Sequence, residues 1–234
     1  TQRDRIEWIK PIMFTAGLGI IDNRHIYKKE IKKGMLICKI GGPAYKVGLG
    51  GGSASSRISS GDNQDLDFSA VQRDDAEMEQ KMNRVIRQCC ELGEKNPIIS
   101  IHDQGAGGNG NVLKEIIEDM GAVIDLGKIT LGDPTMNDIE IWLSEYQESN
   151  ALLIEKEKIY ILQNICNREY VNLDIVGEIT GDKKLHIYNG DKEIIKDYPL
   201  HFKSDRKIYN LSSSNIKLES IKINISLEEA IEKV

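Results

Sequence analysis

The strongest constraint on the fold is the stretch "NPIISIHDQGAGGNGNVLKEII", residues 96–117, where a short apolar run meets a glycine-rich turn and then a helical pattern. The run "PIISI" is typical of a buried strand. From Asn111 onward, the spacing predicts a short amphipathic helix that ends at Gly121. Glycine allows the backbone conformations and close approaches that such a turn requires. A strand that runs directly into a helix favours an α/β architecture.

The same alternation of strands and helices continues on both sides of this stretch. Segments 171–194 predict a strand, a turn and then a hairpin, with "NGDK" as its turn signal. A strand that leads into a loop is expected within 8–21, and further strands are expected at 34–42, 122–129 and 151–155. The other expected helices begin near 76, 133 and 157. The pattern therefore predicts an α/β domain with a mixed sheet and flanking helices.

The chain is expected to have three parts: an N-terminal linker at 1–10, one domain at 11–196, and a C-terminal extension at 197–234. Its 234 residues can bury one substantial core. In the extension glycine disappears and Lys, Ser, Asn and Ile dominate. A strand is expected in "SIKINI", and Ser226 is expected to cap a final helix, with Glu229 at the capping-box position.

Composition narrows the classes of function. Charged residues are 29% of the chain and the net charge is −6, which argues against a nucleic-acid or acidic-membrane partner. We find no long apolar span and no leader pattern, so a cytoplasmic protein is expected. The four cysteines lack C-x-x-C spacing and there are only four histidines, which argues against zinc or iron–sulfur ligation.

Several polar and glycine-rich stretches could carry chemistry, and each also has a purely structural interpretation. Asp103 could bind a hard cation such as Mg²⁺, and the following glycines could approach an anion, or the stretch could be only a capped turn. Its spacing matches neither standard nucleotide-binding glycine motif. The glycines and hydroxyls at 48–56 and the polar run at 145–148 leave the same choice open, whereas acidic residues beside Gln72 favour simple helix capping.

Taken together, the chain resembles the phosphoribosylformylglycinamidine synthases, in the long single-chain form of eukaryotes. The resemblance runs from about Glu7 to Gly181. It is carried by "EWIKPIMF", "GGPAYKVGLGGGSASS", "DLDFSAVQRDDAEMEQKMNRVI", "NPIISIHDQGAGGNGNVLKE", "LGDPTMNDIEIW" and "EYQESNALL". Six long motifs in one order make chance agreement implausible.

The resemblance implies a fold like the C-terminal (B) domain of aminoimidazole ribonucleotide synthetase, here the first such domain of the synthase. It implies a ligase of purine biosynthesis that uses ATP, Mg²⁺ and glutamine to convert formylglycinamide ribonucleotide to formylglycinamidine ribonucleotide. The preceding A domain, with most of the ATP site, and the glutaminase domain would be the partners of this chain. The chain alone is then expected to be inactive.

The resemblance also assigns roles to particular residues, none of them as a catalytic group. Asp103 is expected to bind Mg²⁺. Expected substrate contacts are Gln72, Glu145, Tyr146 and Gln147, with backbone groups of Gly50, Gly51 and Gly52 lining the cleft. Bacterial relatives have Glu-Ser-Gln where this chain has Glu-Tyr-Gln. The alternatives are another enzyme of the same superfamily, such as a selenophosphate synthetase or thiamine-phosphate kinase, or a structural half with an auxiliary site.

Overall fold

The computed structural model describes residues 16–49, 75–200, 226 and 228–229. The chain divides into two units, Thr1–His201 and Phe202–Val234. In the second unit the predicted capping box is present. The backbone N–H of Glu229 donates to Ser226 Oγ at 3.1 Å, and the backbone N–H of Ser226 donates to Glu229 Oε2 at 3.1 Å. The strand expected in "SIKINI" lies outside the described residues.

The first unit contains a seven-stranded sheet in the order β2-β4-β1-β5-β3-β6-β7. Among these described strands only β3 and β6 pair in parallel, and the other neighbours pair antiparallel, so the predicted mixed sheet is confirmed. The strands are β1 Leu36–Gly41, β2 Ile98–Asp103, β3 Ala122–Asp125, β4 Ser149–Ile154, β5 Asn172–Ile179, β6 Lys184–Asn189 and β7 Lys192–Pro199. The β6–β7 hairpin turns at the predicted "NGDK".

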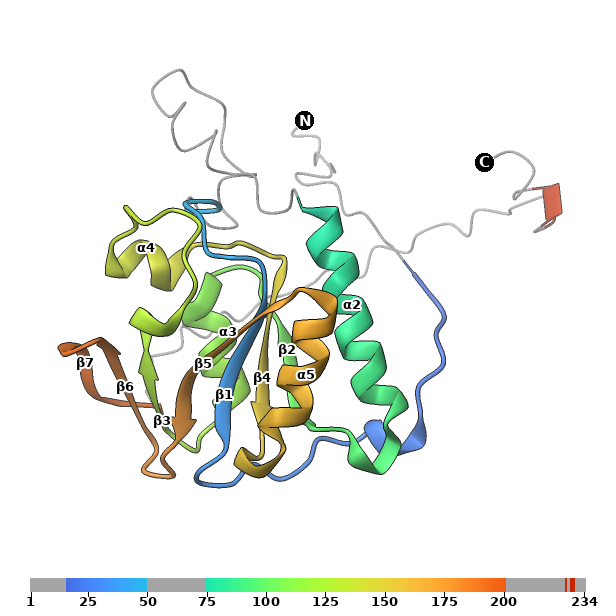
Figure 1. Cartoon of the computed structure of the whole chain (residues 1–234), viewed down its shortest axis with the longest axis horizontal. Helices are drawn as coiled ribbons and strands as arrows, with labels where there is room; N and C mark the ends of the chain where they lie inside the picture. Colours follow the sequence, from blue (N-terminus) through green and yellow to red (C-terminus); the bar gives the residue numbers. More distant parts are fainter. Residues whose placement is uncertain (1–15, 50–74, 201–225, 227, 230–234) are drawn as a thin grey trace, which may run out of the picture. The chain divides into compact units, whose positions relative to one another are not determined.

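Four α-helices flank the sheet in the described residues (Figure 1). They are α2 Ala76–Glu91, α3 Gly108–Ile117, α4 Asp138–Leu143 and α5 Ile159–Glu169. Helices α2 and α5 pack on one face of the sheet, and α3 and α4 pack on the other. None of the described helices has the length and apolar composition that a membrane crossing requires.

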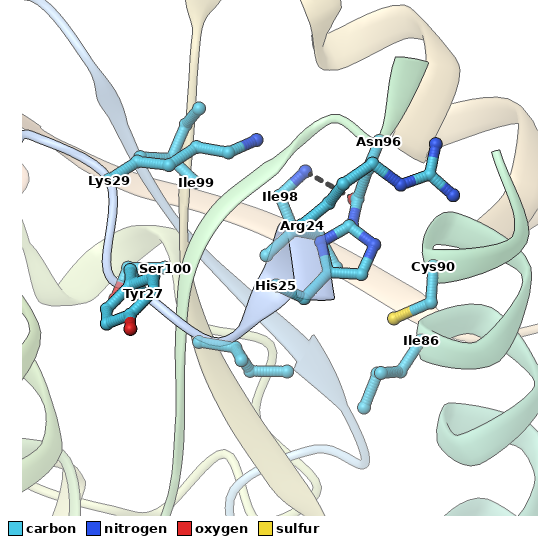
Figure 2. Close-up of a pocket in the computed structure, with 11 residues that line it drawn as sticks. Arg24, His25, Tyr27, Lys29, Ile86, Cys90, Asn96, Ile98, Ile99 and Ser100 are labelled. Carbon is cyan, nitrogen blue, oxygen red and sulfur yellow. Dashed lines mark hydrogen bonds between the residues drawn. The ribbon is translucent and has the colours of Figure 1, made fainter. Parts of the chain in front are cut away.

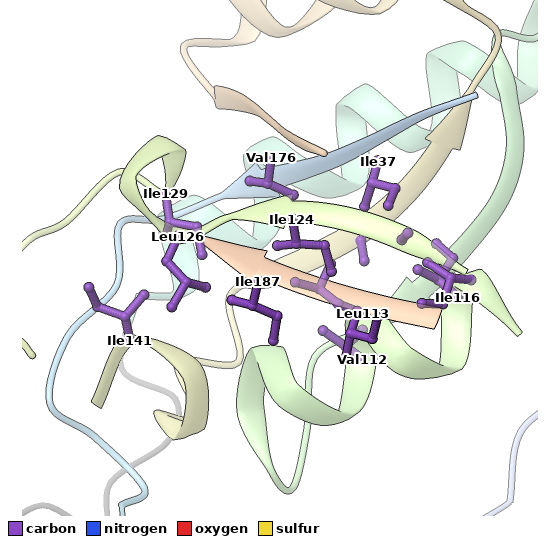
Figure 3. Packing of buried hydrophobic residues seen from close by; sticks show 14 of the residues in the cluster. Ile37, Val112, Leu113, Ile116, Ile124, Leu126, Ile129, Ile141, Val176 and Ile187 are labelled. Carbon is purple, nitrogen blue, oxygen red and sulfur yellow. The ribbon is translucent and has the colours of Figure 1, made fainter. Parts of the chain in front are cut away.

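Strand β1 lies between the two helical layers and is buried along its whole length. Because side chains alternate across a strand, Leu36, Cys38 and Ile40 face the α2 and α5 layer, whereas Ile37 joins the core beneath α3. Figure 3 shows this second core, where Leu113 of α3 lies among isoleucines of the sheet. The continuous apolar run of β1 is thus that of a strand covered on both faces.

Two predictions about local structure were wrong, and both concern the bounds of α3. Helix α3 begins at Gly108 rather than at Asn111, because Gly107 adopts φ +83° and serves as its N-cap. It ends at Ile117, before the predicted stop at Gly121. In the stretch 8–21, where a strand leading into a loop was expected, residues 16–21 are loop, and the residues before them lie outside the described residues.

Candidate functional site

Four strand ends meet at one edge of the sheet, which we call the site edge. Strands β1 and β2 both run antiparallel to β4, which lies between them, so their last residues and the first residues of β4 lie together. Gly41 is opposite Ser149, and Asp103 is opposite Asn150. The start of β5 reaches the same edge, where Asn172 is opposite Gly41. The topology therefore gathers the turn after β2 and the polar segment 144–148 before β4.

Asp103 is the last residue of β2, and its side chain is 81% exposed. An exposed carboxylate at a strand end suits Mg²⁺, which is bound in proteins through one or two carboxylates together with water and phosphate oxygens. In the part of the chain that the structure describes, no three His, Cys, Asp or Glu side chains are grouped so that they could hold a metal. A single exposed carboxylate is the kind of ligand that Mg²⁺ combines with phosphate oxygens and water.

Glu145 lies at the centre of the site edge and is only 1% exposed. Its Oε1 accepts a hydrogen bond of 2.7 Å from the backbone N–H of Gly107, at the start of α3. Its own backbone N–H donates to the Val47 carbonyl at 2.9 Å. Negative charge is favourable at a helix N-terminus. One of the N–H groups that could have met a bound anion is therefore engaged by a carboxylate of the protein itself.

Two glycines bring the backbones at the site edge close together. A Cβ on Gly108, which has φ +57°, would lie 2.3 Å from the Ser144 carbonyl oxygen. A Cβ on Gly48, with φ +65°, would lie 2.5 Å from Glu145 Cβ. Both positions thus require glycine for conformation and for space. The glycine pattern that the sequence offered as an anion loop serves here to pack the turn against segment 144–148.

Tyr146 and Gln147 follow Glu145 but differ in their surroundings. Tyr146 is 5% exposed, and its hydroxyl donates to Asn109 Oδ1 at 3.2 Å and accepts from Asn109 Nδ2 at 3.0 Å. Burial raises the pKa of the Tyr146 hydroxyl, so it stays protonated. Gln147 is half-buried. The Tyr146 side chain is therefore engaged inside the domain, between its two polar neighbours.

Sequence reasoning missed two residues of this site, Lys39 and Gln104. Lys39 is on β1 and is 3% exposed, and its ammonium donates to Gln104 Oε1 and lies 5.3 Å from the centre of the Tyr146 ring. Gln104 is fully buried, and its Nε2 donates to the Tyr146 carbonyl at 3.0 Å and to the Ser144 carbonyl at 3.4 Å. The available signal was a single lysine inside the apolar run "LICKI".

Burial lowers the pKa of Lys39 from its ordinary value of 10.5 to about 7, although the charge of Asp174 acts in the opposite direction. Between these values the folded state holds Lys39 neutral while the unfolded state binds the proton. Stability is therefore expected to rise with pH from about 7 to about 10.5, by about 1.4 kcal/mol per pH unit for this group. Below about pH 7 both states are protonated and the gain is absent.

Urea unfolding of the chain and of a Lys39→Met variant at pH 7, 8 and 9 checks this expectation. The difference in unfolding free energy between the two proteins removes the contributions of other titrating groups. The unfolding free energy of Lys39→Met minus that of the wild type is expected to decrease as the pH rises, because only the wild type gains stability through Lys39. A difference that stays constant with pH would contradict a lowered pKa for Lys39.

The other predicted substrate contacts, Gln72, Gly50, Gly51 and Gly52, lie outside the described residues. Their expected roles stay predictions. Of the residues predicted from the sequence, the structure brings together Asp103, Glu145, Tyr146 and Gln147 at the site edge.

A cavity of about 110 Å³ lies elsewhere, where the 3-10 turn Asn23–His25 meets α2 and the first residues of β2. Figure 2 shows the His25 ring between Arg24 and the α2 side chains of Ile86 and Cys90. Among the described residues, none that the sequence predicted for the site lines this cavity. Cys90 also lines this cavity; the residue is exposed, and the partial burial of its thiol raises the pKa of that group.

Comparison with known proteins places this geometry in context. Residues 32–189 match the protein family described as AIR synthase related protein, C-terminal domain. The chain is 59% identical over 178 residues to a probable phosphoribosylformylglycinamidine synthase, chloroplastic/mitochondrial, of Arabidopsis thaliana, covering 76% of this chain and 13% of that protein. It is 56% identical over 182 residues to the phosphoribosylformylglycinamidine synthase of Homo sapiens, covering 77% of this chain and 14% of that protein. The chain thus spans only a small part of these relatives.

Solved structures support the fold. PurL of Thermotoga maritima complexed with FGAR matches with a TM-score of 0.70 and 21% identity, covering 91% of this chain and 35% of that chain. HypE of E. coli, a hydrogenase maturation protein, matches with a TM-score of 0.51 and 11% identity, covering 77% of this chain and 54% of that chain. At these identities the likeness concerns the fold, because one fold can carry many functions.

Proposed function

This chain belongs to the family of AIR synthase related proteins, whose C-terminal domain it matches, and on that premise we propose that it is part of a phosphoribosylformylglycinamidine synthase. The observation that carries the proposal is the identity of 59% to the Arabidopsis thaliana relative, over 178 residues. The matched range 32–189 contains every described residue of the site edge. We call the longer enzyme of which this chain would be a part the parent synthase.

The proposed reaction is the ATP- and glutamine-dependent conversion of formylglycinamide ribonucleotide to formylglycinamidine ribonucleotide. Phosphoryl transfer to the substrate amide oxygen spreads negative charge, which fixed donors and cations stabilise. In this proposal Asp103 holds Mg²⁺, which neutralises charge on phosphate oxygens when bound. PurL of Thermotoga maritima, which shares the fold, has been solved in complexes with FGAR and with ATP, and this supports the proposed ligands.

The residues of this chain would bind and orient the substrate rather than react with it. Glu145 accepts the hydrogen bond from the Gly107 N–H and so fixes the start of α3. This contact holds the turn that follows Asp103 against the segment that precedes β4. Gln147 lies at the same edge, half-buried, next to Tyr146 in the sequence. Gln72 and the backbone of Gly50, Gly51 and Gly52 complete the proposed substrate contacts.

The remaining domains of the parent synthase would supply most of the ATP site and the ammonia. All four cysteines are free thiols, which supports a reducing compartment such as the cytoplasm. Three of them are buried, Cys38, Cys89 and Cys166, and burial raises the pKa of each to about 12. Buried thiols of this kind are poor nucleophiles, so they are not suited to glutaminase chemistry.

The test compares the chain with the parent synthase in an assay of ADP release that depends on formylglycinamide ribonucleotide and ammonia. The parent synthase is expected to turn over and the isolated chain is expected to be inactive, because a phosphoryl transfer needs the nucleotide held in line with the substrate. Ammonia as the nitrogen donor removes any dependence on a glutaminase. Robust turnover by the isolated chain would overturn the division of the site between domains, and an inactive parent synthase would overturn the proposed reaction.

A further inference from the structure

Lys39 occupies a position that joins three separate parts of the chain. It lies on β1, opposite Ala151 of β4 on one side and Asp174 of β5 on the other. Its ammonium donates to Gln104, the residue that directly follows Asp103. It also lies over the ring of Tyr146, at 5.3 Å from the ring centre. Strand β1, the turn after β2 and segment 144–148 thus converge on one buried side chain.

A lysine at 3% exposure is costly for the fold, because an ammonium loses its hydration there. Its hydrogen bond goes to a neutral amide oxygen. Asp174, the nearby opposite charge, accepts hydrogen bonds of 2.7 Å from the backbone N–H and the hydroxyl of Thr130. A methionine of similar length would fill this space without a charge to desolvate. The reason for a lysine at position 39 therefore lies in the group that its side chain positions and not in the stability of the fold.

What Lys39 holds is the orientation of the Gln104 amide. With Oε1 fixed by the ammonium, Nε2 points to the carbonyl groups of Tyr146 at 3.0 Å and Ser144 at 3.4 Å. The backbone N–H of Gln104 donates to the Ser149 carbonyl at 3.1 Å. Gln104 therefore joins the turn that carries Asp103 to the segment that carries Glu145 and Gln147. Without a donor at Oε1, the amide could rotate and exchange its two ends.

We propose that Lys39 is a positioning residue, which acts through Gln104 to fix the Asp103 turn against segment 145–147. The inference rests on the proposed function for its effect on catalysis, since it names what holds that site together. Sites held within a fraction of an ångström by a supporting shell of hydrogen bonds lose activity when that shell is removed.

The experiment replaces Lys39 by Met in the parent synthase, with Lys156→Met as the matched control. Lys156 is 65% exposed and pairs with Glu178 away from the site edge. Lys39→Met is expected to lower kcat/KM for formylglycinamide ribonucleotide about tenfold or more without lowering Tm, because a buried charge is removed while a supporting contact is lost. Lys156→Met is expected to stay within about twofold. Normal kcat/KM in Lys39→Met would overturn the proposal.

A double-mutant cycle tests whether the effect passes through Gln104. Gln104→Met removes all three hydrogen bonds of the side-chain amide, so adding Lys39→Met to it is expected to cause little further loss of kcat/KM. If the double variant loses kcat/KM by the product of the two single losses, Lys39 acts independently of Gln104 and the proposal is overturned. If Lys39→Met does not fold, Lys39→Leu serves in its place.

A second measurement does not depend on activity and so separates this inference from the proposed function. Hydrogen exchange by mass spectrometry, on peptides covering the turn after Asp103 and segment 144–149, reports the order of both segments. Lys39→Met is expected to speed exchange there about tenfold, including the Gly107 amide that donates to Glu145, whereas Lys156→Met is not. Unchanged exchange would overturn the positioning role even in an active enzyme. An inactive wild-type synthase with the expected exchange would overturn only the proposed function.

Discussion

An Asp103→Asn variant of the parent synthase is expected to lose about a hundredfold or more in kcat while keeping its fold. The change replaces one carboxylate oxygen by an amide nitrogen, which removes the negative charge and keeps the shape of the side chain. Asn is a poorer ligand for Mg²⁺, which prefers carboxylate and phosphate oxygens. The Asp103 side chain is 81% exposed, so Tm is expected to shift by no more than about 2 °C. Steady-state kinetics at several Mg²⁺ concentrations measure the loss in kcat, and a thermal melt measures the shift in Tm.

The matched control is Asp191→Asn, an exposed acidic residue between β6 and β7. It makes the same change of charge away from the site edge and is expected to leave kcat within about twofold. Near-normal turnover of Asp103→Asn would favour the alternative in which this domain is structural and its site auxiliary. A loss of kcat that more Mg²⁺ partly restores would support the metal role directly.

A Gly108→Ala substitution is expected to destabilise the chain by about 2–5 kcal/mol. Gly108 has φ +57°, a conformation in which a side chain is strained. The added Cβ would also lie 2.3 Å from the Ser144 carbonyl oxygen, and backbone atoms on both sides resist the shift needed to relieve that contact. Urea unfolding measures the loss as a change in midpoint at constant slope.

Gly105→Ala offers a control in the same turn. A Cβ at Gly105 meets no atom within 4 Å, so this variant is expected to change stability by about 0.5 kcal/mol or less. Equal effects of the two substitutions would mean that glycine serves only chain flexibility there. A large effect at Gly108 alone would show that the turn is held against segment 144–148 in the folded protein, as the site edge requires.

Local pattern was sufficient for most of the elements of the domain. The apolar run in "LICKIG", the helical pattern that begins near 76 and the "NGDK" turn each predicted an element that is present. These predictions succeed because strand burial, helix amphipathicity and turn conformation depend on residues close together in the sequence. The start of α3 was misplaced, since it depends on the backbone conformation of Gly107.

The same contrast between local pattern and tertiary structure applies to the site. The sequence by itself identified the residues that could carry chemistry, above all Asp103 at a strand end and the polar run that contains Glu145 and Gln147. Only the tertiary structure decided that these segments meet, through β4 pairing between β1 and β2, and that Lys39 reaches Gln104 beneath them. Strand order and buried polar contacts both join residues that are far apart in the chain. Both depend on how the whole domain packs. No local pattern of residues encodes them.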